Sequence, residues 1–178
     1  MNSMTILETP LPDVYLLGLP THFDKRGKFV KTYNEHLFES LGVEFTIAET
    51  FYSWSTKHVL RGMHYQRGHA AHSKIVHCLY GSVLDVVVGI DPSKDTFNQC
   101  FSVELDASNS QALLIGQGYA HGFLSLSNDA LVGYMTSAIH DPQLDTGVLW
   151  SSIAFDWPNN SPIISERDEC HPCIEALV

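Results

Sequence analysis

The sequence has few basic side chains. Its 178 residues include 10 Lys and Arg against 20 Asp and Glu, for a formal net charge of −10. Such a balance argues against general binding to nucleic acids and against docking on anionic membranes, because like charges repel. An anionic small molecule could still bind if the few bases gather in one place.

No apolar stretch is long enough to span a bilayer. The longest run, "VLDVVVGI" at 83–90, is interrupted by Asp85, whereas a spanning helix needs about 20 apolar residues. The first residues, "MNSMTILETPLPDVYLL", lack a basic start and include Glu8 and Asp13, so we expect no signal peptide. We therefore expect a cytoplasmic protein, in which disulfides are rare.

Cysteine is scarce as well. Of the four cysteines, Cys170 and Cys173 form a C-x-x-C in "ECHPC". A redox or zinc site would need a preceding strand–helix pattern or a second pair, and neither is found. We predict a C-terminal tail with two free thiols.

Signals for helices are few, and signals for strands fill most of the chain. One helix is predicted at 34–42, where Asn34 is a suitable N-cap, Leu37, Phe38 and Leu41 form an apolar stripe, and Gly42 ends the pattern. Short segments rich in Val, Ile, Leu, Phe and Tyr alternate with turn residues. The predicted strands cover 28–33, 51–56, 59–66, 73–81, 82–91, 96–105, 111–116, 121–127 and 130–137.

This spacing predicts an all-β protein. Many short strands with few helices are typical of an antiparallel sandwich or barrel, and we predict a β jelly roll that forms a single domain over 1–178. The stretch from about Asp141 holds four of the eight prolines, and we expect it to wrap the outside.

The segment "LRGMHYQ" at 60–66 places polar side chains in a strand. His64 and Gln66 share one face by the two-residue period of a strand, while Arg61 nominally faces the other way. A bulge at Gly62 would bring Arg61 to the same side. The strand thus presents an arginine, an imidazole and an amide to one cavity.

Other polar residues stand among apolar neighbours in nearby strands. Asp85 interrupts a Val-rich run, Lys74 shares a face with Val76, and Tyr134 lies in "LVGYMT". His121 falls in "GYAHGF", which we interpret as a tight turn flanked by glycines. Each alone fits a structural role, but together they supply positive charge, a base and an acid.

A metal site is the competing interpretation, because the chain has ten histidines and cupin barrels often hold metals with His and Glu. In "HYQRGHAAH" the histidines are His64, His69 and His72. None forms the H-x-H pair of metal-binding cupins, and no Glu follows before Glu104. We therefore predict no metal.

The sequence resembles the dTDP-4-dehydrorhamnose 3,5-epimerase family over about residues 13–168. The resemblance rests on ordered motifs: "FDKRGKF" at 23–29, "LRGMHYQ" at 60–66, "SKIVHCLYGSVLDVVVGI" at 73–90, "GYAHGF" at 118–123, "DWP" at 156–158 and "SERD" at 165–168. It implies a cupin-type jelly roll that acts as a homodimer, without metal or organic cofactor, on a nucleotide-diphospho-sugar.

The resemblance also implies roles for individual residues. The catalytic set would be His64 as base, Asp168 as its acidic partner, Lys74 near the keto oxygen and Tyr134 as the acid on the opposite face. Arg61 and Arg26 would hold the diphosphate, Arg26 reaching across from the partner subunit. The substrate pocket would further include Phe29, Gln66, Asp85 and His121.

These roles fit the chemistry of a 4-keto sugar. Its C3 and C5 protons are acidic because either carbanion delocalises onto the C4 oxygen. His64 suits proton removal at neutral pH, and a carboxylate on its other nitrogen would fix its tautomer. Lys74 would stabilise the enolate oxygen, and Tyr134 would return a proton from the other face.

Four positions depart from the family pattern. Lys31, Glu49 and Phe51 stand where dTDP-specific members usually have Glu, Gln and Asn near the base and adjoining sugar. Because a carboxylate for an amide and an ammonium for a carboxylate, at Glu49 and Lys31, reverse donor and acceptor roles, a CDP- or GDP-linked substrate is an alternative to a dTDP-linked one. His140 replaces a Tyr near the sugar, which leaves open whether both C3 and C5 are inverted.

The sequence thus predicts a cofactor-independent epimerase of a nucleotide-linked 4-keto-6-deoxy sugar, serving the synthesis of deoxy sugars for polysaccharides or glycosylated natural products. The nearest alternative is a C3-only or C5-only epimerase of a CDP- or GDP-linked sugar. A metal-dependent cupin oxygenase and a non-catalytic binding module are the alternatives from other classes.

Overall fold

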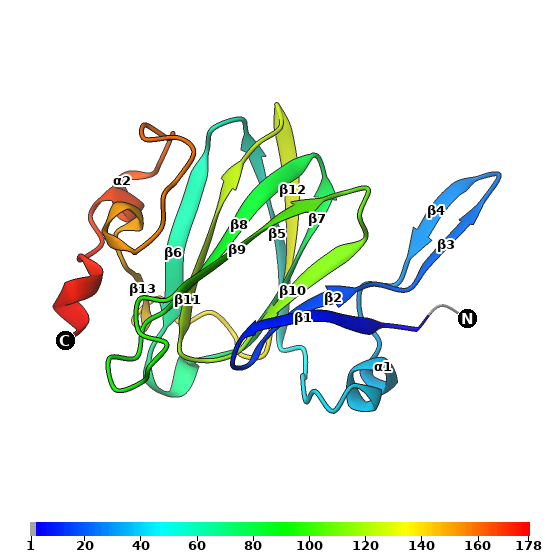
Figure 1. Ribbon diagram of the computed structural model, residues 1–178, viewed down its shortest axis with the longest axis horizontal. Helices are drawn as coiled ribbons and strands as arrows, with labels where there is room; N and C mark the ends of the chain where they lie inside the picture. The colour runs from blue at the N-terminus through cyan, green and yellow to red at the C-terminus, as the bar shows by residue number, and fades with distance from the viewer. Residues whose placement is uncertain (1–2) are drawn as a thin grey trace.

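Two antiparallel sheets pack face to face in the computed structural model, which describes residues 3–178 (Figure 1). The six-stranded sheet has the order β1-β2-β10-β7-β12-β5, and the five-stranded sheet has the order β13-β6-β11-β8-β9. A separate hairpin, β3-β4, extends to one side. The predicted all-β, cupin-type jelly roll is confirmed.

The elements have the following bounds. The strands are β1 (Thr5–Leu11), β2 (Val14–Gly18), β3 (Thr21–Asp24), β4 (Gly27–Val30), β5 (Glu49–Thr56), β6 (Leu60–Gln66), β7 (Lys74–Tyr80), β8 (Ser82–Gly89), β9 (Cys100–Asp106), β10 (Gln111–Ile115), β11 (Tyr119–Ser125), β12 (Asp129–Thr136) and β13 (Asp145–Gly147). The α-helices are α1 (Glu35–Ser40) and α2 (Glu166–Glu169), and short 3-10 turns cover Gly68–Ala70, Trp150–Ser152 and Ile174–Leu177.

The apolar core between the sheets explains the long hydrophobic run of β8. Val83 and Val87 point into the main core, while Val86 and Val88 belong to a second cluster on the outer face of the same sheet. A strand buried on both faces reads as nearly continuous hydrophobic sequence. Asp85 lies on the inward side of this strand and is fully buried.

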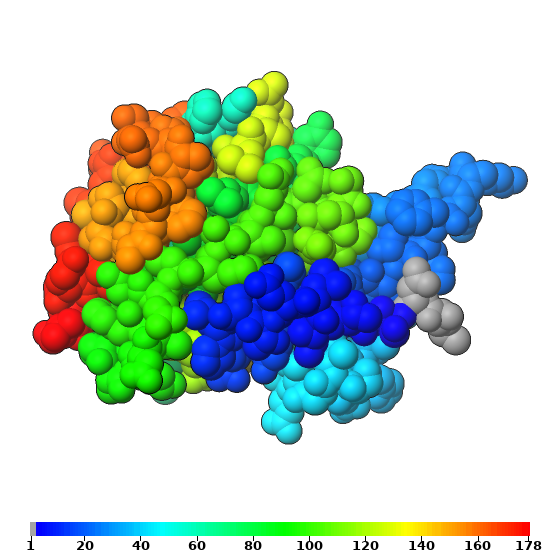
Figure 2. All heavy atoms as spheres, viewed as in Figure 1, coloured from blue at the N-terminus to red at the C-terminus, as the bar shows by residue number. Residues whose placement is uncertain are grey.

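The C-terminal segment covers the outer face of the five-stranded sheet, as the proline content predicts. Val148, Ile153, Trp157 and Ile174 are buried in the second apolar cluster, together with Leu60 of β6 and other residues of that sheet. Figure 2 shows this segment, in orange and red, packed over one end of the molecule. The cysteines of its C-x-x-C are exposed free thiols, as predicted.

Helix α1 forms where the sequence predicts it. The side chain of Asn34 accepts a hydrogen bond from the Leu37 amide at 3.1 Å, and Gly42 adopts a positive φ of 72° just beyond the helix. Phe38 is buried in a third apolar cluster that includes Ile75 of β7. The helix thereby covers part of the outer face of the six-stranded sheet.

The β3-β4 hairpin, here called the arm, projects from the body (Figures 1 and 2). Phe23 and Phe29 on this arm are 75% and 61% exposed. Two large aromatic side chains on a projecting hairpin have little to pack against within one chain.

Three sequence predictions about local structure are wrong. Strand β11 begins at Tyr119 rather than 121, so His121 lies within a buried strand and not in a turn. The segment 96–99 precedes β9 as a turn, and the strand predicted at 28–33 ends at Val30. Strands β1, β2, β3 and β13 lie outside the predicted strands. Strand β1 tolerates Pro10 because it is an edge strand with shifted register.

No helix among residues 3–178 has the length and apolar character that a membrane crossing requires.

Candidate active site

A cavity of about 290 Å³ opens between the two sheets. Nine of the predicted site residues line it: Glu49, Phe51, Arg61, His64, Gln66, Lys74, His121, Tyr134 and His140. His64 and His121 come from the five-stranded sheet, and Lys74 and Tyr134 come from the six-stranded sheet. The two walls of the cavity therefore carry different chemical groups.

An irregularity in β6 brings Arg61 to the cavity, as the sequence predicts. His64 pairs with His121 across β6 and β11, but Arg61 pairs with Phe123, so β6 holds one extra residue between these pairs. Gly62 has φ of 143°, and a Cβ there would lie 2.5 Å from the Gly122 Cα. Only glycine fits at this position, where the strands approach closely.

Arg61 is fixed by its own neighbours. Its Nε donates to the Ser55 hydroxyl at 2.9 Å, and its Nη2 donates to the Trp54 carbonyl at 3.1 Å. Both partners lie on β5, so the guanidinium bridges the two sheets at the cavity. One end of the guanidinium is held by these contacts, and the rest of this cation is available to an anionic group.

His64 is paired with a buried carboxylate. Its Nε2 lies 2.7 Å from Asp168 Oδ1, and the Gly62 amide donates to Asp168 Oδ2 at 3.1 Å. Burial pushes the pKa of Asp168 upward, but the hydrogen bond and charge of His64 and the Gly62 amide outweigh it, so this pKa is lowered. An ionised carboxylate only accepts hydrogen bonds, so Nε2 of His64 donates and Nδ1 carries the lone pair.

A second histidine, His171, lies behind the same carboxylate. Its Nε2 is 3.6 Å from Asp168 Oδ1, and its ring packs edge-on to that of His64 with centroids 5.7 Å apart. Burial lowers the pKa of His171, and the charge of His64 lowers it further. The His171 side chain is 8% exposed, so this imidazole belongs to the interior.

His121 forms another buried pair. Its Nε2 lies 2.9 Å from Asp85 Oδ2, and both side chains are almost fully buried. Asp85 does not line the cavity itself but supports His121 from behind. Of these two predicted site residues, His121 lines the cavity, and Asp85 lies next to the cavity through its contact with His121.

Lys74 and Tyr134 lie on the opposite wall with little access to water. Burial lowers the pKa of Lys74 to about 8, although Asp145 and Asp85 oppose the shift. Burial likewise raises the pKa of Tyr134 above that of a free phenol. Tyr134 stacks on Phe51 of β5 with ring centroids 4.7 Å apart. Desolvation thus favours the neutral form of both groups.

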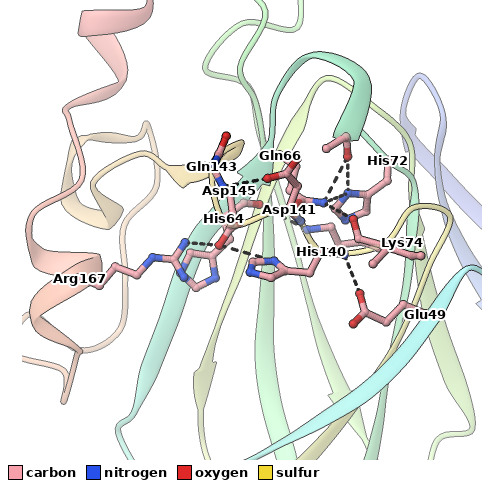
Figure 3. Close-up of polar contacts among 12 residues, drawn as sticks. Glu49, His64, Gln66, His72, Lys74, His140, Asp141, Gln143, Asp145 and Arg167 are labelled. Atoms are coloured by element: carbon pink, nitrogen blue, oxygen red, sulfur yellow. Dashed lines mark hydrogen bonds and ion pairs between the residues drawn. The ribbon is translucent and has the colours of Figure 1, made fainter.

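Polar contacts cross the remaining part of the cavity (Figure 3). Gln66 Oε1 accepts from the Asp141 amide at 2.6 Å, and Glu49 Oε2 accepts from the His140 amide at 2.9 Å. Arg167 Nη2 donates to Asp145 Oδ2 at 2.6 Å. These contacts fix the segment after β12 against β5, β6 and α2, and they place carboxylates beside the cations of the cavity.

The predicted residues of the arm lie outside this cavity. Arg26 is bound to Asp24 of its own hairpin and is 84% exposed, and Phe29 lines a shallow depression on the arm. Lys31, just beyond the arm, is also exposed and does not line the cavity. A contribution of these three residues to a site stays a prediction.

Sequence reasoning missed several residues of the site. Arg167 lies in the "SERD" motif, and Asp145, His72 and Thr136 also line the cavity. His171 gave no signal, because more than 100 residues separate it from His64 along the chain. Only the folding of the C-terminal segment over β6 brings these two histidines together.

Known proteins share this architecture over nearly the whole chain. The family model described as dTDP-4-dehydrorhamnose 3,5-epimerase matches residues 8–176. A protein of that name from Escherichia coli K12 is 41% identical over 170 residues, which cover 93% of this chain and 92% of the relative.

Two crystal structures are similar to this fold. The enzyme of that name from Bacillus anthracis, solved with TDP and pyrophosphate bound, has a TM-score of 0.92 and 34% identity, covering 96% of this chain and 99% of that one. A 3,5-epimerase from Legionella pneumophila, in complex with dTDP-4-keto-L-rhamnose, has a TM-score of 0.91 and 30% identity, covering 97% and 93%. The chain described here belongs to the dTDP-4-dehydrorhamnose 3,5-epimerase family and is an isomerase.

Proposed function

We propose that the protein epimerises a nucleotide-diphospho-4-keto-6-deoxy sugar at C3 and C5, without a cofactor, and that dTDP-4-dehydro-6-deoxyglucose is the substrate type. The names of the relatives support this substrate class, as does the dTDP-4-keto-L-rhamnose bound to the Legionella enzyme. The observation that carries the proposal is the His64–Asp168 pair facing Lys74 and Tyr134 across one cavity.

His64 is the proposed base. Its Nδ1 carries the lone pair that takes a proton from C3 or C5, and Asp168 stabilises the imidazolium that results. The Gly62 amide keeps the carboxylate ionised and oriented. Proton transfer of this kind contributes about 10²–10⁴-fold to the rate.

Lys74 is the proposed partner of the enolate oxygen. The carbanion formed at C3 or C5 places negative charge on the C4 oxygen, and an ammonium in a buried site stabilises that charge more strongly than water does. With a pKa of about 8, Lys74 is charged in most molecules at neutral pH before substrate binds. The incoming diphosphate and the developing enolate both favour this charged form.

Tyr134 is the proposed acid. It projects from the sheet opposite to His64, so it reaches the face of the sugar that His64 does not. Its raised pKa keeps the hydroxyl protonated, and delivery of that proton to the enolate carbon completes inversion. His121 and Asp85 support the same wall as His64 and keep a second imidazole near the Tyr134 ring, with centroids 6.1 Å apart.

The diphosphate is proposed to bind Arg61 together with Arg26 of a second subunit. The arm with its exposed Phe23 and Phe29 supports a homodimer in which each arm packs on the neighbouring body. Light scattering of the purified protein tests this assembly, since a monomer at micromolar concentration would contradict it.

A second candidate is a C3-only or C5-only epimerase of a CDP- or GDP-linked sugar. Glu49 and Phe51 support it, because both line the cavity at positions where dTDP-specific members usually have Gln and Asn. A carboxylate such as Glu49 accepts hydrogen bonds only, so it favours a base edge that donates. His140 at the cavity supports an altered sugar site.

Deuterium incorporation from heavy water, followed by NMR, tests the proposal on dTDP-, CDP- and GDP-linked 4-keto-6-deoxy sugars. Label at both C3 and C5 of the dTDP sugar is the expected result. Label at one carbon only, or only on a CDP or GDP sugar, would favour the second candidate. No exchange on any of the three would contradict the proposed substrate class.

A further inference from the structure

We propose that His64, Asp168 and His171 form a three-ligand site for Zn²⁺, and that Zn²⁺ bound there switches the enzyme off. The inhibitory part of this inference rests on the proposed role of His64 as base. The binding part rests only on the arrangement of the three side chains.

The three ligand atoms are already close together. Nε2 of His64, Oδ1 of Asp168 and Nε2 of His171 all lie within 4.8 Å of one another, and Oδ1 is 2.7 Å and 3.6 Å from the two nitrogens. In a tetrahedral zinc site with bonds of about 2.0–2.1 Å, ligand atoms stand about 3.4 Å apart. Side-chain shifts on the order of 1 Å would therefore complete the site.

The His171 ring provides an independent reason to expect a ligand. Its Nε2 is buried and has no hydrogen-bond partner among the described residues, and an unsatisfied buried polar atom is costly. Gly147 packs so tightly on the ring that a Cβ there would lie 2.6 Å from it. The ring is thus held with an unpaired nitrogen directed at Asp168, which a cation would satisfy.

The surroundings of Asp168 suit single-oxygen coordination. The Gly62 amide occupies Oδ2 at 3.1 Å, which leaves Oδ1 for a metal, and such outer hydrogen bonds commonly fix metal ligands. Two imidazoles and one carboxylate match the ligand preference of Zn²⁺. His64 lines the cavity, so a cation and its remaining water can enter from that side.

Other histidine–carboxylate contacts in the described chain offer fewer ligands. His121 has Asp85 alone, and His36 on the surface has Glu39 alone. Within residues 3–178, the cluster of His64, Asp168 and His171 is the one group of three close enough to share a metal. Zinc binding should therefore have one dominant site.

Inhibition follows from the tautomer of His64. In the enzyme without zinc, Nε2 donates to Asp168 and Nδ1 holds the lone pair. When Zn²⁺ takes the Nε2 lone pair, the neutral imidazole carries its proton on Nδ1 instead. Nδ1 can then no longer accept the proton of C3 or C5, and Asp168 is occupied by the metal.

Calorimetric titration of the chelator-treated full-length protein with ZnCl₂ tests binding. We expect one site per chain in the unmodified protein, no comparable site for MgCl₂, and at least a tenfold weaker affinity in His171→Asn, since even outer-shell changes cost about 10–100-fold. His36→Asn removes an exposed histidine outside the cluster and should bind zinc normally. His171→Gln with a thermal melt separates loss of a ligand from loss of the fold.

Deuterium exchange into substrate tests the switch. ZnCl₂ should stop exchange in the unmodified protein, and EDTA should restore it. His171→Asn should need at least a tenfold higher zinc concentration for the same fractional loss of exchange, with each protein compared with its own zinc-free rate. Equal zinc affinity in His171→Asn and the unmodified protein would overturn the site, and exchange that continues with the site filled would overturn the inhibition. If no substrate exchanges even without zinc, the proposed function fails while the titration still decides the metal site.

Discussion

The two walls of the cavity treat their ionisable groups in opposite ways. On the five-stranded sheet, His64 and His121 each contact a buried carboxylate, at 2.7 Å and 2.9 Å. On the six-stranded sheet, burial lowers the pKa of Lys74 and raises that of Tyr134. One wall is therefore built to receive a positive charge. On the other wall burial shifts both groups toward their neutral forms, although Lys74 stays mostly charged at neutral pH.

This difference suits a reaction that moves a proton through the sugar. The wall that stabilises an imidazolium can take the proton, and the wall that keeps a phenol protonated can return one to the opposite face. Inversion needs a proton acceptor on one face of the sugar and a proton donor on the other, and these two walls supply one of each. Substitutions on each wall should therefore have different effects.

The largest effect is expected from His64→Asn, which removes the proposed base from the first wall. Deuterium exchange at both carbons should fall about 10³–10⁴-fold, because the imidazole paired with Asp168 is lost. NMR of the recovered sugar measures the exchange. His69→Asn, which alters an exposed histidine outside the cavity, should keep full activity; an equal loss there would contradict the assignment.

The next largest effect is expected from Asp168→Asn. An amide cannot stabilise the imidazolium as a carboxylate does, so kcat/KM should fall by about 10²–10³-fold. Asp85→Asn, in the second pair, should lose less, because Asp85 does not hold the base. Equal losses in the two variants would erase the distinction between the pairs.

The same variant should change acid stability. The pKa of Asp168 is lowered in the folded protein, so its contribution is present above the ordinary aspartate value of about 4 and is lost as the pH falls through the lowered value. Urea melts of the unmodified protein should therefore lose stability in this acid range more steeply than melts of Asp168→Asn.

A smaller and more selective effect is expected from Tyr134→Phe on the second wall. Exchange should persist within about tenfold, because His64 can remove and return a proton on its own face, while inversion should fall about 10²-fold. Parallel measurement of deuterium content and of epimeric product separates the two. Loss of exchange and inversion in equal proportion would contradict the separate role of Tyr134 as the acid on the second wall.

The smallest effect is a pH dependence from Lys74. Its folded pKa of about 8 lies below the ordinary 10.5, so kcat/KM should decline above about pH 8 as the ammonium is lost. Lys74→Arg keeps its charge and should remove this decline, although at a lower overall rate. Folding stability should rise between pH 8 and 10.5 in the unmodified protein, since the buried site favours the neutral amine.

The fold was largely predictable, because its strands follow local patterns. Strands β6 to β8 and helix α1 combine clear apolar periodicity with turn or capping residues, such as Gly81 and Asn34. Strand β1 was missed because Pro10 is tolerated only at a sheet edge, which the sequence does not reveal. The start of β11 was placed two residues too late because "GYAHGF" has the composition of a turn.

The site was predictable where its residues share a strand or a motif. Arg61, His64 and Gln66 follow one another on β6, so their convergence depends on one bulge at Gly62. The contact of His171 with His64 and the position of Arg167 against Asp145 depend on the path of the C-terminal segment. Such long-range contacts leave no local signal in the sequence.

The origin of Asp168 in the C-terminal segment bears on the order of events during synthesis. Ribosomes make the chain from its N-terminus, so every strand from β1 to β13 emerges before the carboxylate that pairs with His64. His64 therefore lacks its carboxylate partner until the last part of the chain has been made. A chain that ended before α2 would lack both this carboxylate and Ile174, which is buried against the five-stranded sheet.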